Sequence, residues 1–352
     1  HALAVANCTV ALHMACLALD IGPGDEVILP SLTFVATANA VLYTGATPVF
    51  ADIASLDDWT ISPADIAARI TPRTRAIIVM HYGGYPCAMD EILALARRHG
   101  LAVIEDAAHA PGATIRTGGA GRTGSPDRTA SPSAGPFCGA LGDIGCFSFF
   151  SNKNLAVGEG GMVTTQRADL AERLRLLRSH GMTTLTWDRH RGHAYSYDVV
   201  ALGYNYRLDE LRAARGLAQL ARLAENNRRR AGIVAEYRRG LADLPGLRLP
   251  FANHPGESAY HLAPILLPAG RDRLAVIDAL RAAGVQTSIH YPPIHLFSLY
   301  RQRLGLGEGL LPLTETVASR ELTLPLFPTM SEEQVDLVIE AVRAQHSPVE
   351  SR

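Results

Sequence analysis

The chain has 352 residues, of which 47% are apolar, and its formal net charge is −1 at neutral pH. This length exceeds what one hydrophobic core usually serves, so we expect two domains. The balanced charge gives no electrostatic attraction to nucleic acid or anionic lipid, and no apolar run approaches the ~20 residues of a membrane span. Five scattered cysteines without CxxC spacing argue against a disulfide framework or a zinc site and fit a reducing cytoplasm.

Short apolar runs alternate with helical patterns in the first half of the chain. We predict strands at 26–30, 48–52, 76–81, 101–106, 146–150 and 161–165, and helices at 9–19, 34–43 and 89–99. This alternation indicates βαβ units in a mainly parallel sheet, in which ligands bind at the carboxyl ends of the strands. Asp106 and Lys153 both lie at or just beyond such ends.

The second half has shorter elements. A helical stretch at 207–240 is expected to bridge two domains, followed by strands at 259–267, 285–289 and 320–324 and helices at 271–283 and 331–344. We therefore predict a large domain over residues 1–220 and a smaller α+β domain over residues 221–352.

Residues 116–140 differ from the rest in composition. Gly, Ser, Thr and Pro make up 15 of these 25 residues. Such a composition buries too little apolar surface to order itself, so we predict a flexible surface loop. Its three arginines lack interleaved aromatic residues and do not indicate nucleic-acid binding.

Lys153 is the only lysine in the chain, and the other 32 of its 33 basic residues are arginine. Arginine replaces lysine in solvation and ion pairing, but its guanidinium stays protonated and cannot form a Schiff base. A chain that keeps one lysine therefore suggests a need for an amine at that position. The alternative is that codon bias removed the other lysines and left this one by chance.

A lysine bound to pyridoxal phosphate (PLP) needs partners that this sequence offers. Asp106 ends the predicted strand 101–106 and is a candidate for pairing with the pyridine nitrogen; the alternative is an N-cap of the next helix. His109, three residues later, would return to the same side on a helical turn, or be structural. Glu105 points to the opposite face of the strand and is the weaker candidate.

Two hydroxyls are candidates for binding the phosphate. Thr9 lies near a predicted helix N-terminus, where amide groups favour an anion, and Ser148 lies five residues before Lys153. Each is alternatively a helix cap or a satisfied core group.

Other ligand classes have little support. No Walker A pattern occurs, and the GEGG turn at 158–161 resembles no nucleotide loop. His190 and His193 have metal-ligand spacing, but no Glu or Cys lies nearby to complete a ligand set, so we predict no metal.

The motifs GPGDEVI (22–28), TFVATAN (33–39), GATPVF (45–50), EDAAH (105–109), GDIGCFSF (142–149), KNL with GEGG (153–161), LGYNYR (202–207), HYPPIH (290–295) and LPLF (324–327) follow one another along nearly the whole chain. In this order they resemble the DegT/StrS family of PLP-dependent sugar aminotransferases. The resemblance implies fold type I, the aspartate-aminotransferase-like fold. That fold has a large α/β domain with a mainly parallel seven-stranded sheet flanked by helices, and a smaller C-terminal α+β domain.

The resemblance also implies roles for residues of the site. Lys153 would form the Schiff base with PLP, and Asp106 would pair with the pyridine nitrogen. His109 would approach the ring oxygen, and Phe34 would stack on the ring.

Thr9, the amide of Val10 and Ser148 would hold the phosphate. Asn205 would reach the phosphate of a neighbouring subunit, which makes a homodimer necessary for a complete site. The residues expected near the substrate are His290, Tyr291 and His295.

The expected activity is transfer of an amino group from glutamate or glutamine to a keto-sugar, with the cofactor passing between PLP and pyridoxamine phosphate (PMP). A nucleotide-linked keto-deoxysugar of a surface-glycan or secondary-metabolite pathway is the expected acceptor, and the expected location is the cytoplasm. The alternatives are a keto-cyclitol aminotransferase, a PLP-dependent sugar dehydratase and a non-catalytic PLP-binding regulator. Lys153 argues against the dehydratase, because such relatives tend to carry histidine there.

Three departures from the family pattern accompany this prediction. Cys8 stands where relatives usually have glycine, which bears on phosphate binding. The stretch 116–140 is longer than the usual connection. The family's N-terminal helical segment is expected to be missing, since the sequence starts at His1.

Overall fold

The computed structural model describes residues 1–115, 135–183 and 197–346. Its larger part is built on a seven-stranded sheet in the order β1-β7-β6-β5-β4-β2-β3. The strands are β1 (Ala2–Val5), β2 (Glu26–Pro30), β3 (Thr47–Ala51), β4 (Thr74–Met80), β5 (Ala102–Asp106), β6 (Ile144–Ser148) and β7 (Gly161–Thr164). The five strands from β3 to β6 in this order are parallel, and β7 and β1 are each antiparallel to their neighbours.

The prediction of a mainly parallel α/β fold is confirmed, and six of the strands lie within two residues of their predicted bounds. The sequence pattern did not reveal β1. This strand has only four residues and pairs only with β7, so its alternation is too short to stand out.

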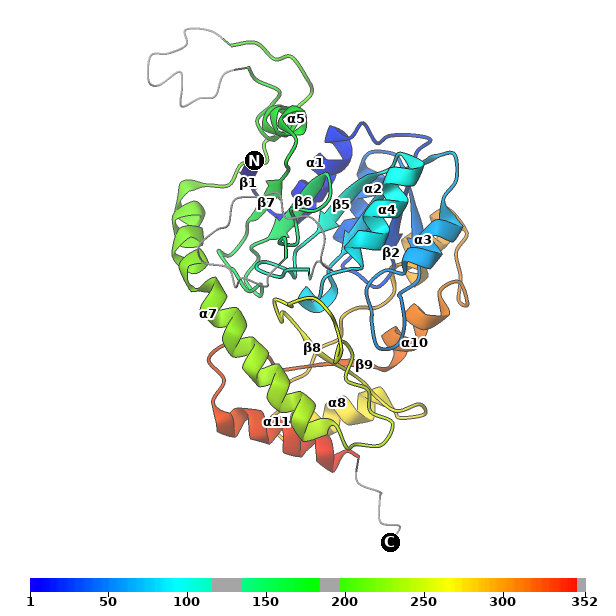
Figure 1. Cartoon of the computed structure of the whole chain (residues 1–352), viewed down its shortest axis with the longest axis vertical. Coiled ribbons are helices and arrows are strands. Elements are labelled where there is room, and N and C mark those ends of the chain that lie inside the picture. Colours follow the sequence, from blue (N-terminus) through cyan, green and yellow to red (C-terminus); the bar gives the residue numbers. More distant parts are fainter. Residues whose placement is uncertain (116–134, 184–196, 347–352) are drawn as a thin grey trace.

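Helices cover both faces of the sheet (Figure 1). The first face carries α1 (Cys8–Ala18), α2 (Ala36–Tyr43) and α5 (Ala168–Arg178), and the second carries α3 (Pro63–Arg69) and α4 (Met89–His99). Successive residues of a strand point to opposite faces. Val27 and Leu29 accordingly join the apolar core under α1, whereas Ile28 joins the core under α4.

A long helix, α7 (Glu210–Leu241), runs from the large sheet to the C-terminal part of the molecule (Figure 1). Its second half packs with α8 (Arg273–Ala282), α11 (Glu332–Ala344) and a two-stranded antiparallel sheet of β8 (Ala263–Leu266) and β9 (Glu321–Leu324). This is the second apolar core. The predicted boundary at residue 220 falls inside α7.

The strand predicted at 285–289 is wrong. Ser288 forms a single bridge with Thr323, and no further ladder follows. Two residues later, the amide of His290 donates to the side chain of Glu321 instead of a backbone carbonyl. The chain therefore leaves β9 at this point.

After this departure the chain returns to the large sheet. Its elements are η2 (Ile294–Leu296), α9 (Ser298–Leu304) and α10 (Pro312–Arg320). Ile294, Tyr300 and Leu311 belong to the same apolar core as α1 and α2. The C-terminal third thus contributes to both cores.

The predicted loop at 116–140 is only partly described, since residues 116–134 lie outside the described ranges. Its last six residues are held in place, which corrects the prediction for that end. Ile115 donates to the Pro136 carbonyl and Cys138 donates to the Ala113 carbonyl. The Gly139 amide donates to the buried Glu105 carboxylate.

Candidate active site

Most of the predicted site residues meet at one cavity of about 350 Å³. It lies where the parallel strands end, because the chain leaves β2 towards Phe34, β5 at Asp106 and β6 towards Lys153. Parallel strands bring these ends to one edge of the sheet. The predicted residues that line the cavity are Thr9, Phe34, Asp106, His109, Ser148, Lys153, His290 and Tyr291.

Lys153 lies in the turn that follows β6, where its amide donates to the Phe150 carbonyl at 2.9 Å. Burial lowers the pKa of its amine from 10.5 to about 8, and the negative charge of Asp106 opposes this shift only in part. A lysine with such a pKa carries a far larger neutral fraction near neutral pH than an exposed one. The cavity therefore contains an amine that can act as a nucleophile.

Asp106 is a buried carboxylate with neutral hydrogen-bond donors. The Thr37 hydroxyl donates to Oδ2 at 2.8 Å, and the Ala108 amide donates to Oδ1 at 3.2 Å. Burial raises the pKa of Asp106, and these bonds offset the rise in part. The residues after it form turns, so it caps no helix. A cationic group in the cavity would supply the positive counter-charge that these neutral donors do not give the carboxylate. The protonated pyridine nitrogen of PLP is such a group.

Glu105 faces the other side of the sheet, and all of its acceptor capacity is used there. The amides of Gly139, Leu141 and Gly142 each donate to it at 2.7 Å, and His81 Nε2 lies 3.0 Å away. Burial favours its neutral form, but these bonds outweigh burial and hold the pKa of Glu105 below its usual value. Glu105 thus anchors the 137–142 segment and does not reach the cavity.

His109 is neutral and is tied to Tyr291. Its Nδ1 accepts from the Gly83 amide at 3.3 Å, so Nε2 carries the proton and donates to the Tyr291 hydroxyl at 2.9 Å. Burial, helped by the charge of Lys153, holds the pKa of His109 well below its usual value. A cofactor oxygen that approached His109 would therefore compete with Tyr291, a link that the sequence did not reveal.

The N-terminus of α1 opens onto the cavity and is suited to a phosphate. The Val10 amide already donates to the side chain of Asn7 at 3.0 Å, so a phosphate would have to displace that bond. Within the described part of the chain, the amides of Cys8 and Thr9 have no acceptor. Sequence reasoning overlooked Asn7, although an asparagine before a helical pattern is a common N-cap.

Gly161 and Phe34 complete the surroundings. A Cβ on Gly161 would lie 2.6 Å from the Asn7 carbonyl carbon, so only glycine lets β7 pass this close to the start of α1. The Phe34 side chain is 57% exposed in a protein whose other large apolar side chains are mostly buried. Its ring is thus available for stacking on a flat ligand.

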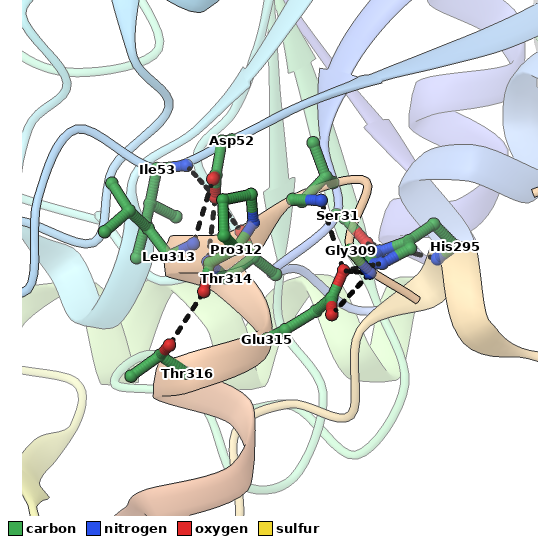
Figure 2. Close-up of polar contacts among 11 residues, drawn as sticks. Ser31, Asp52, Ile53, His295, Gly309, Pro312, Leu313, Thr314, Glu315 and Thr316 are labelled. Carbon is green, nitrogen blue, oxygen red and sulfur yellow. Dashed lines mark hydrogen bonds and ion pairs between the residues drawn. The ribbon is translucent and has the colours of Figure 1, made fainter. Parts of the chain in front are cut away.

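Besides Val10, two predicted residues do not line the cavity. Asn205 is exposed, and its backbone bridges to Ser179. His295 is buried between Ser31 Oγ, 2.7 Å from Nδ1, and Glu315 Oε1, 3.1 Å from Nε2 (Figure 2). With both ring nitrogens engaged, His295 holds the 294–296 turn against the large sheet.

Figure 2 also shows how α10 is fixed. Asp52, at the end of β3, accepts from the amides of Leu313 and Thr314 at 3.0 and 2.8 Å and from the Thr314 hydroxyl at 2.7 Å. A carboxylate from a distant strand thereby caps this helix.

Within the described ranges, no set of three or more His, Cys, Asp or Glu side chains is placed to hold a metal ion. His190 and His193 lie outside those ranges. None of the described helices has the length and apolarity needed to cross a membrane.

Comparisons with known proteins point in one direction. The profile of the DegT/DnrJ/EryC1/StrS aminotransferase family matches residues 1–343. The spore coat polysaccharide biosynthesis protein SpsC of Bacillus subtilis is 42% identical over 348 residues, covering 97% of this chain and 85% of SpsC.

Solved structures agree with that match. DesV of S. venezuelae, crystallised in complex with a ketimine intermediate, superposes with a TM-score of 0.86 at 38% identity, covering 99% of this chain and 86% of DesV. The putative sugar aminotransferase Spr1654 of Streptococcus pneumoniae, in its PLP form, gives a TM-score of 0.84 at 27% identity, covering 97% and 86% of the two chains.

Proposed function

Because this chain belongs to the DegT/DnrJ/EryC1/StrS aminotransferase family, whose members are PLP-dependent enzymes of fold type I, we propose that it moves an amino group from glutamate or glutamine to a keto-sugar. The acceptor in this proposal is a nucleotide-linked keto-deoxysugar used for a surface glycan or a secondary metabolite. The name of SpsC, a spore coat polysaccharide biosynthesis protein, supports a surface glycan.

One observation carries the proposal. The chain's only lysine opens onto a cavity that also contains a buried carboxylate and the N-terminus of a helix. These are an amine, a partner for a cationic ring nitrogen and an anion site. Together they match the three polar features of PLP, and the exposed Phe34 ring matches its flat face.

The residues would share the work as follows. Bound PLP supplies an aldehyde carbon and an electron-withdrawing ring. Asp106 would hold a proton at the ring nitrogen, and Thr9 and Ser148 would hold the phosphate at the start of α1. Nζ of Lys153 would take and return protons at the reacting carbon, and its lowered pKa of about 8 suits both directions of transfer near neutral pH.

A homodimer is part of the proposal. Asn205 is exposed in one protomer, and the surface near it and along the start of α7 carries exposed apolar side chains among charged ones. Leu202, Leu211 and Leu217 are 82%, 85% and 73% exposed. Apolar exposure of this extent is typical of a surface that another protein covers. We propose that a second copy covers it and that Asn205 reaches the partner's phosphate.

The test has two stages. The PLP-loaded protein is first mixed with glutamate or glutamine, and conversion to PMP is followed by absorbance. The PMP form is then offered a nucleotide-linked keto-deoxysugar, the same sugar without its nucleotide and a keto-cyclitol, with products identified by mass spectrometry.

An amino sugar that retains its nucleotide is the expected product, and Lys153→Ala should give none. Amination of the cyclitol alone would contradict the sugar assignment. Loss of water from the sugar without consumption of the amino donor would indicate the dehydratase instead.

A further inference from the structure

Glu321, the first residue of β9, is a buried carboxylate behind the cavity wall for which the proposed reaction has no role. Its Oε2 accepts from the His290 amide at 2.8 Å, and its Oε1 accepts from the Thr323 hydroxyl at 2.5 Å. The same hydroxyl lies 2.9 Å from Nδ1 of His290, whose ring lines the cavity with Lys153. Glu321, Thr323 and His290 thus form a chain of hydrogen bonds that ends at the cavity.

The hydrogen atoms available to these three side chains determine which ring nitrogen of His290 carries the proton. Thr323 has one hydroxyl hydrogen, and an ionised Glu321 takes it. The contact between Thr323 and Nδ1 of His290 then needs a hydrogen from the ring. Burial and the charge of Lys153 lower the pKa of His290 to about 4, so the ring has a single proton near neutral pH. That proton is therefore on Nδ1, and Nε2 is left as an acceptor on the ring edge opposite β9.

A proton on Glu321 reverses the two hydrogen bonds that Thr323 makes, to Glu321 and to His290. Oε2 still accepts from the His290 amide, so the added proton is on Oε1 and is donated to the Thr323 oxygen. The Thr323 hydroxyl then donates to Nδ1, and the ring proton moves to Nε2. The number of protons on the ring is unchanged, but Nε2 has become a donor.

From this geometry we propose that Glu321, acting through Thr323, is a positioning residue that selects the tautomer of His290 and so decides whether Nε2 accepts or donates a hydrogen bond in the cavity. The donor form suits a carbonyl oxygen and the acceptor form suits a hydroxyl or an amine. A keto-sugar and its amino product differ in this respect. The effect on substrate binding therefore rests on the proposed function. The hydrogen-bonded relay of Glu321, Thr323 and His290 is independent of that function.

Glu321 gains or loses its proton within an experimentally accessible pH range. Burial raises its pKa to about 8, against the opposing effects of the Thr323 hydroxyl, the His290 amide and the Arg273 charge. Tyr82 donates to the His290 carbonyl, Tyr291 lies beside the His290 ring, and Lys153 faces it across the cavity. His109 and His261 also interact electrostatically with His290. Lys153 titrates in the same range, so a pH profile of activity cannot by itself separate the two groups.

Histidine-selective ¹⁵N NMR on the PLP-loaded protein tests the proposal, since a protonated and an unprotonated ring nitrogen have well-separated shifts. The chain has 13 histidines, and the signals absent from His290→Gln identify the ring of interest. In the wild type we expect the ring proton on Nε2 at pH 6 and on Nδ1 at pH 9.5.

Three variants isolate the relay. Glu321→Gln keeps the hydrogen-bonding shape of a protonated Glu321 and should hold the proton on Nε2 at both pH values. Thr323→Ser keeps the hydroxyl and should respond like the wild type, whereas Thr323→Val should lose the response. Glu26→Gln neutralises another buried carboxylate, bound to Arg73 at the far end of β2, and should leave His290 unchanged.

A His290 tautomer that is the same in wild type and Glu321→Gln at both pH values would overturn the relay, and so would a pH response that survives in Thr323→Val. At one fixed pH, Glu321→Gln should also change KM for the keto acceptor at least threefold more than kcat. A tautomer that responds as expected in a protein that aminates no keto-sugar would leave the relay standing and refute the proposed function.

Discussion

Replacing Asp106 with asparagine is expected to lower the pKa of Lys153 further below about 8. Burial depresses the pKa of this amine, and the negative charge of Asp106 is the largest effect that opposes the depression. Asparagine keeps the size of the side chain and an oxygen that can accept from the Ala108 amide, while its NH2 group faces the Thr37 hydroxyl, which can turn to accept; the charge is removed.

The size of the change follows from electrostatics. Two unit charges on the order of 8 Å apart, in a site of effective dielectric about 20, attract by about 2 kcal/mol, which is about 1.5 pKa units. The pKa of Asp106 is itself raised by burial, so its charge is partial at the lower end of the titration. We therefore expect Lys153 to titrate at least about one unit lower in Asp106→Asn than in the wild type.

Because the sequence has a single lysine, the pKa of Lys153 can be measured without overlap from other lysines. Reductive methylation of the cofactor-free protein with ¹³C-formaldehyde labels the N-terminal amine and, among the side chains of this sequence, Lys153 alone. The ¹³C shift of the Lys153 methyl groups is then followed against pH. Asp278→Asn is the matched control, because Asp278 is an exposed carboxylate paired with Arg281 on α8.

Three results are possible. A fall of the Lys153 pKa in Asp106→Asn but not in Asp278→Asn supports the assigned geometry. An unchanged pKa would show that Asp106 does not face the amine. A wild-type lysine that titrates near 10.5 would refute the argument at its start, because the cavity would then not desolvate the amine at all.

Four further outcomes are expected. Borohydride reduction of the PLP-loaded protein should attach pyridoxyl to Lys153 alone, as peptide mapping would show; a label found only on the N-terminal amine would contradict the assignment. Mixed dimers of Lys153→Ala and Asn205→Asp should regain activity, because one of the two sites holds both intact residues; inactive dimers with confirmed subunit exchange would place Asn205 elsewhere. Asp52→Ala should lower the free energy of unfolding by about 2–4 kcal/mol in urea titrations, because the first amides of α10 lose their cap. The folded pKa of Glu321 is raised from 4.5 to about 8, so wild-type stability should fall as pH rises through that window, and Glu321→Gln should not show the fall.

The sequence alone determined most strands of the sheet and two central residues of the candidate site. Strand and helix periodicities placed six strands of the large sheet to within two residues, because buried parallel strands are continuous apolar runs that contrast with the helices between them. It also singled out Lys153 and Asp106, since a lone lysine and an acidic strand end are unusual without any knowledge of the fold. Their meeting at one cavity follows from parallel strands sharing an edge.

Only the tertiary structure decided which of the remaining polar residues face the cavity. HYPPIH reads as one motif, yet His290 and Tyr291 line the cavity whereas His295 is engaged by Ser31 and Glu315. Hydrogen bonds between residues far apart in the chain, such as Tyr291 with His109, have no sequence signal. Burial and protonation depend on what surrounds a group in space, and local sequence patterns do not contain that information.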